Sequence, residues 1–327
     1  MLPRGREIDQ GVIEVDQRRI HGLADASIAR GLLLAVNGRA SGVDDPQRTA
    51  AELGAILDEL GAEAETVVTA SEDDLFEALR AAVATRRRVV LVGGDGSLHA
   101  AANASLGQLP ELALVPAGRA NNIARALGIP TDRLGALEVA ATAPARPLDA
   151  LRVSTPERTL YALEAVSAGF QAEARSGYDA ENSADLRQGV RALAHAVRRF
   201  TPYDLHARLD GEDLETGAAA QLFISNLPYF GFGFEVDPGA DPGDGRAEAI
   251  LIEASSRAEL MRLFAATYRG RHLGRPGVRR MGARQAELTE PIPLVADAEP
   301  LGTTTATVSV EPARLRVAAP PAQEATG

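Results

Sequence analysis

The sequence predicts an α/β protein with an N-terminal parallel-sheet nucleotide-binding domain and a C-terminal β-sandwich-like domain. From about residue 32 to residue 130, short apolar runs alternate with amphipathic stretches, a pattern typical of a parallel sheet covered by helices. After about residue 149 the pattern changes to short strands joined by turns, with one predicted helix at 187–200. A chain of 327 residues is long enough for two such domains.

Four strand–helix units account for the first half of the chain. Asp45 and Pro46 predict the start of the first helix, because proline is favoured at the first helical position. Ser71 is placed to cap the second helix, and Gly128 followed by Pro130 is a stop signal for the fourth. The strands of these units are expected at 32–36, 64–70, 89–92 and 112–116.

The second half is predicted as strands connected by turns. The runs that indicate strands are LRVS, TLYALEAVSAG, YDLHARLDGEDLETG, QLFISN, AEAILIEA and ATVSVEPARLRVAAP. The expected units are an extension at 1–27, a nucleotide-binding domain at 28–148, a β-rich domain at 149–306, and a segment at 307–322 with the option of rejoining the first domain.

Composition narrows the function classes. The net charge of −11 argues against nucleic acid as a partner and against broad adhesion to anionic lipid. The lack of cysteine, of a signal-peptide pattern and of a membrane-length apolar run favours a cytoplasmic protein. The five histidines show no zinc-site spacing, and we interpret them as ordinary residues.

The 34 basic residues are all arginine, because the sequence contains no lysine. A P-loop requires a lysine, and a protein kinase requires a strand lysine on the nucleotide phosphates. Both classes are therefore excluded. Any phosphate binding must rely on backbone N–H groups, arginine or a metal ion.

A glycine-rich turn, GGDGS at 93–97, joins an apolar run to an alanine-rich helix. Its glycines let the backbone approach a ligand closely, and the helix N-terminus that follows suits a phosphate. A plain strand-to-helix turn has the same pattern. Asp95 favours the phosphate interpretation, since a carboxylate there is useful for holding Mg²⁺ or a nucleotide hydroxyl. Its structural alternative is to cap the helix that follows the loop.

Four loops are expected at one edge of the predicted sheet, at 37–42, Thr69, 93–97 and 116–121. Ligands of such sheets bind outside the carboxyl ends of the parallel strands. The sequence therefore predicts a binding site formed by these loops.

The pair of GGDGS at 93–97 and PAGRANNIARALGIP at 116–130 resembles the diacylglycerol kinase catalytic domain family, which includes bacterial lipid kinases and sphingosine kinases. The family signatures are a GGDGT loop and a P-x-G-T-x-N-D loop, and the pair at this spacing is specific. The resemblance extends to VNGRAS, VSAGFQAE, SNLPYFGFGFEVDPGADPGDG and LVADAEPLG, and so covers the chain from about residue 30 to residue 320.

This resemblance implies a two-domain lipid kinase with an ATP site between its domains. The GGDGT-like loop would wrap the ATP phosphates with Gly93, Gly94, Asp95, Gly96 and Ser97. The other positions where the family contacts nucleotide correspond to Asn37, Thr69, Gly118, Arg119 and Asn121.

The resemblance also implies a metal site and a catalytic base. The segment of the family that helps bind Mg²⁺ corresponds to 239–246, with Asp244 as the retained carboxylate. The D-G-E motif of the family corresponds to Asp297, Ala298 and Glu299, and its glutamate is the proposed base for the acceptor hydroxyl.

A verbatim DGE occurs elsewhere, at 210–212. It lies between alternating strands, where Asp-Gly is the usual hairpin turn, so we predict a turn there. The neighbours in LVADAEPLG favour 297–299 as the functional copy. The structural alternative for that copy is a solvated loop carboxylate.

Several positions depart from the family pattern, namely Ala100, Arg119, Asn122, Glu164, Gln171 and Ala298. Some of the lost groups belong to the acidic network that would hold Mg²⁺. Three interpretations remain open: Glu164 and its neighbours compensate, the enzyme is slow or specialised, or the protein is a nucleotide-binding relic.

The predicted function is phosphorylation, with ATP and Mg²⁺, of a hydroxyl on a diacylglycerol-like or long-chain-base lipid. The alternatives are a catalytically degenerate nucleotide- or lipid-binding relative and an NAD kinase-like enzyme, which shares the GGDGT loop and the two-domain plan. The expected partners are ATP and lipid, with no nucleic acid and only transient peripheral membrane contact, and a homodimer is left open. The arginine-rich segment at 268–280 is interpreted as a solvated loop, with lipid headgroup contact as the alternative.

Overall fold

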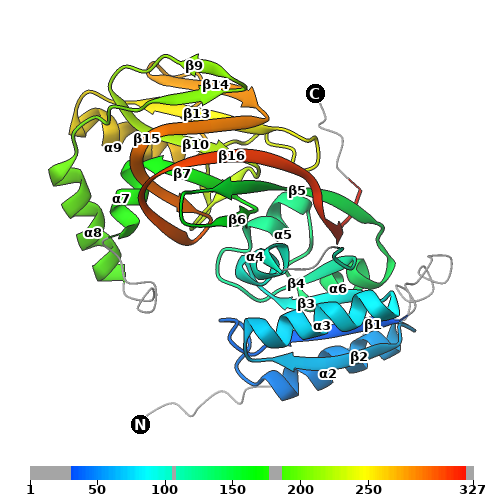
Figure 1. The fold of residues 1–327 in the computed structure, drawn as a ribbon. Helices are drawn as coiled ribbons and strands as arrows, with labels where there is room; N and C mark the ends of the chain where they lie inside the picture. The colour runs from blue at the N-terminus through cyan, green and yellow to red at the C-terminus, as the bar shows by residue number, and fades with distance from the viewer. Residues whose placement is uncertain (1–30, 105–107, 177–185, 322–327) are drawn as a thin grey trace, which may run out of the picture.

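The computed structural model describes residues 31–104, 108–176 and 186–321, so the predicted extension at 1–27 lies outside the described residues. The chain forms two lobes, a parallel sheet with helices and a β-rich lobe (Figure 1). This arrangement confirms the predicted fold class.

The N-terminal lobe is built on four parallel strands in the order β2-β1-β3-β4. The strands are β1 (Leu32–Asn37), β2 (Ala64–Thr69), β3 (Arg88–Gly93) and β4 (Leu112–Pro116). The helices are α2 (Pro46–Glu59), α3 (Glu72–Thr85), α4 (Asp95–Asn103), α5 (Asn122–Leu127) and α6 (Arg133–Thr142). Because helices cover the sheet, β1, β3 and β4 are buried runs of mainly Leu, Val and Ala, whereas the edge strand β2 is largely half-buried or exposed.

Local signals fix where these helices begin and end. The carboxylate of Asp45 accepts a hydrogen bond from Arg48 N at 3.0 Å, and Pro46 is the first residue of α2. Ser71 and Asp74 form a reciprocal capping box at the start of α3. Gly128 ends α5 with a φ of 69°, a conformation that glycine adopts without steric cost.

The C-terminal lobe is mostly antiparallel sheet. Its strands are β5 (Ala145–Ser154), β6 (Thr159–Ala162), β7 (Ala165–Gly169), β8 (Ala207–Leu209), β9 (Glu212–Leu214), β10 (Ala219–Ser225), β11 (Tyr229–Phe230), β12 (Phe234–Glu235), β13 (Ala247–Glu253), β14 (Val278–Ala283), β15 (Gln285–Ala296) and β16 (Glu299–Ala318). Its helices are α7 (Phe170–Ser176), the expected α8 (Leu186–Arg199) and α9 (Arg257–Thr267).

Strand β16 joins the two lobes. It pairs antiparallel with β15 and β5, and near its end Val317 pairs with Leu112 of β4. It sweeps from the β-rich lobe to the parallel sheet as one long arc (Figure 1). The start of β16 is therefore held in place relative to the loops of the N-terminal lobe.

The predicted single strand at 159–169 is wrong in one respect, because Leu163 and Glu164 interrupt it between β6 and β7. Their backbone N–H groups donate to the carboxylate of Asp297, at 2.8 Å each. The Asp297 side chain, from the β15–β16 turn, thus accepts the backbone N–H groups that a continuous strand would donate to a neighbouring strand.

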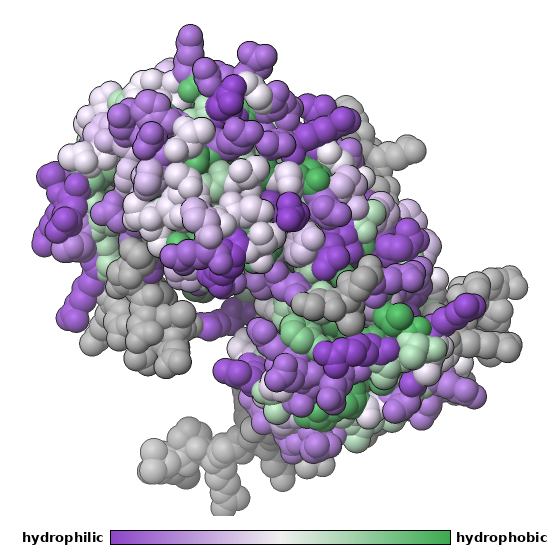
Figure 2. Space-filling model, in the orientation of Figure 1, coloured by the Kyte–Doolittle hydropathy of each residue, from purple (hydrophilic) through white to green (hydrophobic). Residues whose placement is uncertain are grey.

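The surface is mostly hydrophilic on the face drawn in Figure 2, with hydrophobic residues in small separate groups and a hollow between the two lobes. Among the described residues, no helix is both long enough and apolar enough to cross a membrane.

Candidate active site

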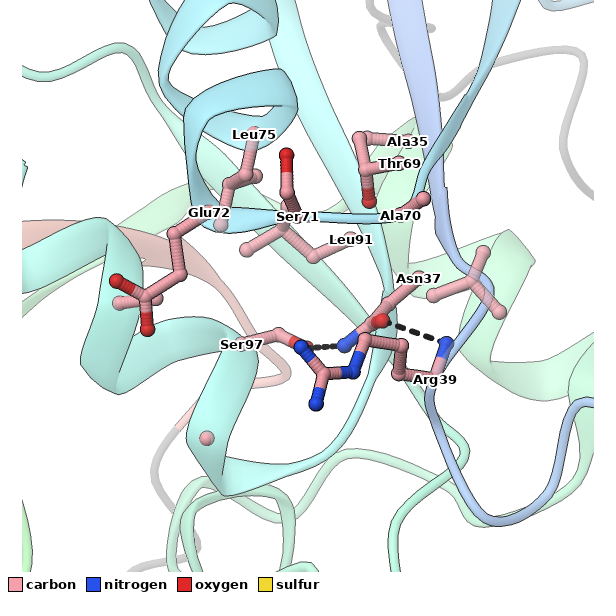
Figure 3. A pocket seen from close by; sticks show the side chains of 13 residues that line it. Ala35, Asn37, Arg39, Thr69, Ala70, Ser71, Glu72, Leu75, Leu91 and Ser97 are labelled. Carbon is pink, nitrogen blue, oxygen red and sulfur yellow. Dashed lines mark hydrogen bonds between the residues drawn. The ribbon is translucent and has the colours of Figure 1, made fainter.

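The carboxyl ends of β1, β2 and β3 open on a cavity of about 290 Å³. Asn37 Nδ2 donates to Ser97 Oγ at 3.0 Å across it, and Arg39 extends into the same opening (Figure 3). Thr69 also lines the cavity, and its Oγ1 donates to Val36 O at 3.4 Å. The structure thus brings together Asn37, Thr69 and Ser97 as predicted. It adds Arg39, which we did not predict.

Backbone hydrogen bonds tie the loops at this edge to one another. Gly38 N donates to Thr69 O at 2.9 Å, and Gly42 N donates to Ala117 O at 2.9 Å. Ala117 N in turn donates to Gly93 O at 2.7 Å. The four loops therefore form one connected rim.

The glycines of the 93–97 loop have different tasks. A Cβ on Gly94 would lie 2.8 Å from the Cα of Gly118, and a Cβ on Gly93 would lie 2.2 Å from Ser97 Oγ. A Cβ on Gly96 would meet nothing within 4 Å. Gly94 and Gly118 are therefore needed for two loops to pack, whereas Gly96 borders open space.

The carboxylate of Asp95 faces the start of α5 and does not point into solvent. Its oxygens accept hydrogen bonds from Asn122 N and Ile123 N, each at 3.0 Å. Burial raises the pKa of Asp95, and these two amides offset part of that rise. Asp95 therefore does not cap the helix that directly follows its loop, α4, as the structural alternative supposed; it accepts from the first amides of α5 and so links the two signature loops.

Asn121 stabilises its own loop. Its Oδ1 accepts from Gly118 N at 3.0 Å, and its Nδ2 donates to Gly118 O at 2.9 Å. Its φ of 50° lies in the left-handed region that asparagine tolerates. Asn121 therefore shapes the turn that presents Arg119 to a second cavity.

This second cavity, of about 510 Å³, lies between the lobes. Gly96 lines both cavities, so the two meet at the 93–97 loop. The N-terminal lobe contributes Asp95, Gly96, His99, Arg119 and Ala120. The C-terminal lobe contributes Glu164, Arg175, Gly231, Phe232, Asp297, Ala298, Glu299 and Pro300.

Asp297 occupies the turn between β15 and β16, with a φ of 51°. Its carboxylate, in a residue that is 8% exposed, accepts the N–H groups of Leu163, Glu164 and Ala165 at 2.8, 2.8 and 3.2 Å. Arg175 of α7 donates to the carbonyl of Ala298 at 2.8 Å. The turn is thus held from two sides, and Glu299 follows it.

Glu299 lies between two basic side chains. Its Oε1 accepts a hydrogen bond from Arg158, and its Oε2 is 3.7 Å from Nε2 of His99. The other ring nitrogen of His99, Nδ1, is 2.9 Å from Asp297 Oδ2. Neither His99 nor Arg158 was predicted. For His99 a signal existed, because it lies one helical turn after Asp95 on the same side of α4.

The carboxyl group of Glu164 is buried beside Asn122. Both residues depart from the family pattern. Its Oε2 accepts from Asn122 Nδ2 at 3.1 Å and from Gly231 N at 2.9 Å. Burial, followed by the charges of Asp297 and Asp95, raises the pKa of Glu164 well above its usual value. Carboxyl groups under such mutual repulsion are typical of functional sites.

The structure does not bring Asp244 to either cavity. Its Oδ1 accepts from the N–H of Arg246 at 2.9 Å, and the neighbouring Gly245 N donates to Asp149 Oδ2 at 2.7 Å. The bond from Gly245 to Asp149 holds the segment against β5, and Asp244 lines neither cavity. Within the described parts of the chain, no group of three or more histidine and carboxylate side chains is arranged to hold a metal ion.

Residues 31–153 match the family model of the diacylglycerol kinase catalytic domain, and residues 164–319 match that of the YegS C-terminal NAD kinase beta sandwich-like domain. The chain thus combines a segment that matches the diacylglycerol kinase catalytic domain with one that matches the YegS-type C-terminal domain. The first cavity is lined entirely by residues of the first matched segment, whereas the second cavity is lined by residues of both, so the candidate site extends from the first segment to its junction with the second.

Proteins similar to this chain include a probable lipid kinase YegS-like of Xanthomonas campestris pv. campestris, 28% identical over 88% of this chain and 95% of the relative. A diacylglycerol kinase of Mycobacterium tuberculosis is 26% identical over 80% of this chain and 86% of that protein. A solved diacylglycerol kinase of Bacillus anthracis str. Sterne gives a TM-score of 0.67 at 16% identity, covering 89% of this chain and 97% of that one. The similarity to this solved structure shows the fold alone.

Proposed function

We propose that this protein transfers a phosphoryl group from ATP, with Mg²⁺, to a hydroxyl group of a diacylglycerol-like or long-chain-base lipid. The observation that carries the proposal is that Gly96 lines both cavities. On one side lie the polar groups of Asn37 and Ser97, and on the other lie the carboxyl groups of Asp297 and Glu299. A nucleotide and an acceptor bound in the two cavities would meet at this loop.

The residues present fit nucleotide phosphates. The open space at Gly96 lets phosphate oxygens approach the backbone N–H groups at the start of α4. The N-terminus of α5 is already occupied by Asp95, so α4 is the helix left to receive an anion. Arg39 and Arg119 supply the positive charge that a lysine supplies in other kinases.

The carboxyl groups fit a hard divalent cation. Magnesium prefers oxygen ligands and keeps several waters and substrate phosphates in its shell. Burial, and then repulsion by Asp297 and Asp95, raises the pKa of Glu164, and a cation near Glu164 and Asp95 would offset the repulsion. We therefore propose these two residues, rather than Asp244, as the side of the cavity that would face Mg²⁺.

When bound, Mg²⁺ and ATP supply charge neutralisation and the phosphoryl group. The protein's part is to place the acceptor hydroxyl and remove its proton. Glu299 would take that proton as the hydroxyl oxygen bonds to the γ-phosphorus of ATP and the bond to ADP breaks, and would later release the proton to solvent. Phe232, 58% exposed at the rim of the second cavity, offers an apolar contact for the lipid chains.

A coupled assay of ADP formation tests this function across acceptors. Purified protein with ATP and Mg²⁺ is offered diacylglycerol, a long-chain base and NAD, each with a no-acceptor control. We expect phosphate transfer to a lipid and none to NAD. Transfer to NAD alone would establish the NAD kinase-like alternative, and ATP binding without any transfer would establish the degenerate relative.

A further inference from the structure

Helix α4 carries a histidine that the reaction outlined above leaves without a role. His99 lies four residues after Asp95, and both line the cavity between the lobes. Its side chain is 21% exposed. It is the residue of α4 that reaches the β15–β16 turn, since Nδ1 is 2.9 Å from Asp297 Oδ2 and Nε2 is 3.7 Å from Glu299 Oε2.

The backbone around His99 is fixed independently of that turn. One helical turn later, Asn103 Nδ2 donates to Tyr161 O, and Tyr161 N donates to Asn103 Oδ1, each at 2.8 Å. The same amide donates to His99 O at 2.9 Å. Strand β6 therefore holds α4 at the position from which His99 reaches between the two carboxylates.

Asp297 does not need His99 to stay in place, because three backbone N–H groups already hold its carboxylate. The bond between them therefore serves the imidazole. A carboxylate accepts the proton on Nδ1, which fixes the ring plane and directs Nε2 toward Glu299.

We infer that His99 is a positioning residue that holds Glu299 at the inner side of the cavity, in opposition to Arg158, which binds Glu299 from the more exposed side; this inference rests on the proposed function. Glu299 is 36% exposed, and the Arg158 side chain is 46% exposed. Without His99, the pair with Arg158 alone would set where the carboxylate lies. Glu299 would then be drawn outward, away from the acceptor.

The charges around the imidazole support this role. Burial lowers the pKa of His99, but the hydrogen bond and charge of Asp297, with smaller contributions from Glu299 and from Glu72 on α3, outweigh it and raise the pKa overall. Across the same cavity lie Asp95, Glu164, Arg119 and Arg175. A protonated imidazole attracts the Glu299 carboxylate that its Nε2 faces.

Two substitutions separate the functions of the two ring nitrogens. In His99→Asn the side-chain amide can still donate to Asp297 in place of Nδ1, and in His99→Gln it can donate toward Glu299 in place of Nε2. We expect His99→Asn to lower kcat on the order of tenfold with an unchanged KM for ATP, and His99→Gln to retain most of the activity. Equal losses in both, or wild-type kcat in His99→Asn, would overturn the inference.

An NMR titration tests the inference without turnover. The pKa of the His99 imidazole is measured in the wild type, in Glu299→Gln and, as a control on an exposed glutamate, in Glu212→Gln. We expect Glu299→Gln to lower that pKa and Glu212→Gln to leave it unchanged. If the wild type phosphorylates no acceptor, the proposed function fails, and the titration still decides whether His99 is coupled to Glu299. An unchanged pKa in Glu299→Gln would overturn that coupling.

Discussion

Two Asp-x-Glu turns in this protein have nearly the same local structure and very different surroundings. Asp210 and Asp297 both have left-handed φ values, 49° and 51°, in two-residue turns between antiparallel strands. Both carboxylates accept consecutive backbone N–H groups of a neighbouring segment, Arg284 and Gln285 in the first case. The hairpin turn that we expected at 210–212 is confirmed, and the 297–299 copy is a hairpin turn as well.

The surroundings separate the two turns. The 210–212 turn is exposed on the rim of the β-rich lobe. The 297–299 turn lies where β15 ends and β16 begins, beside the 93–97 loop, and it faces His99, Arg158 and Glu164. A short motif therefore acquires its chemistry from what the rest of the fold brings to it. The turn type does not distinguish the two copies.

The largest difference between the turns is expected in stability. Asp297→Ala leaves three backbone N–H groups without their acceptor in a buried place, so we expect it to cost about 3 kcal/mol or more. Asp210→Ala removes an acceptor at an exposed turn, where water replaces it, and is expected to cost about 1 kcal/mol or less. Urea unfolding of both variants measures the gap. Equal losses would mean that the two turns are not distinguished by burial.

Gly94 and Gly96, in the 93–97 loop, are expected to differ in what their replacement costs. In Gly94→Val the new side chain collides with the backbone of Gly118, so we expect about 1–3 kcal/mol of destabilisation, seen as a lowered Tm. In Gly96→Val the side chain projects into open space, so the Tm is expected to change little while the rise in Tm produced by ATP and Mg²⁺ is lost. A ligand-induced shift that survives Gly96→Val would contradict the placement of the nucleotide.

Glu164 tests whether the functional turn carries a stability cost. Glu164→Gln keeps the shape and can still accept from Asn122 and Gly231, but it removes the repulsion with Asp297 and Asp95. We expect a gain of about 1 kcal/mol, or a Tm higher by about 2–4 °C. Because the native pKa is raised, the wild type loses stability as pH rises through it, so the gain should be larger at pH 8 than at pH 5. A loss of stability at pH 8 would refute this.

The smallest expected effect is in how the stability cost of replacing each of the two aspartates depends on pH. The native pKa of His99 is raised above its ordinary 6.5, so its pairing with Asp297 stabilises the fold fully below about pH 6.5. That stabilisation is lost as pH rises through the raised value. The cost of Asp297→Ala should therefore be somewhat larger at pH 6 than at pH 9, and the cost of Asp210→Ala should be the same at both. Chemical denaturation at the two pH values measures this.

The sequence predicts well those parts of the protein that depend on neighbouring residues. Asp45, Ser71 and Gly128 mark helix ends through contacts within a few positions, so the parallel lobe could be laid out in order. The loops at the ends of its strands follow from topology alone.

The contacts that define the candidate site span long stretches of chain. His99 and Asp297 are 198 positions apart, and Arg158 and Glu299 are 141 apart. No local pattern encodes such pairs, which explains why Arg158 was missed and why the interruption at Leu163 was not expected. The spacing of His99 from Asp95 was visible in the sequence, but its two carboxylate partners were not. The proximity of Glu164 and Asn122 likewise needed the structure, and it supports compensation among the departures from the family pattern.

We propose that Glu299, and not Glu212, serves the acceptor hydroxyl. The most direct measurement compares kcat of Glu299→Gln and Glu212→Gln with a lipid that the wild type phosphorylates, alongside ATP affinity. We predict that Glu299→Gln lowers kcat by roughly 10²–10⁴-fold, as expected on losing a general base, with ATP affinity nearly intact, and that Glu212→Gln behaves as the wild type. Loss of activity in Glu212→Gln with normal turnover in Glu299→Gln would contradict the assignment of the two turns.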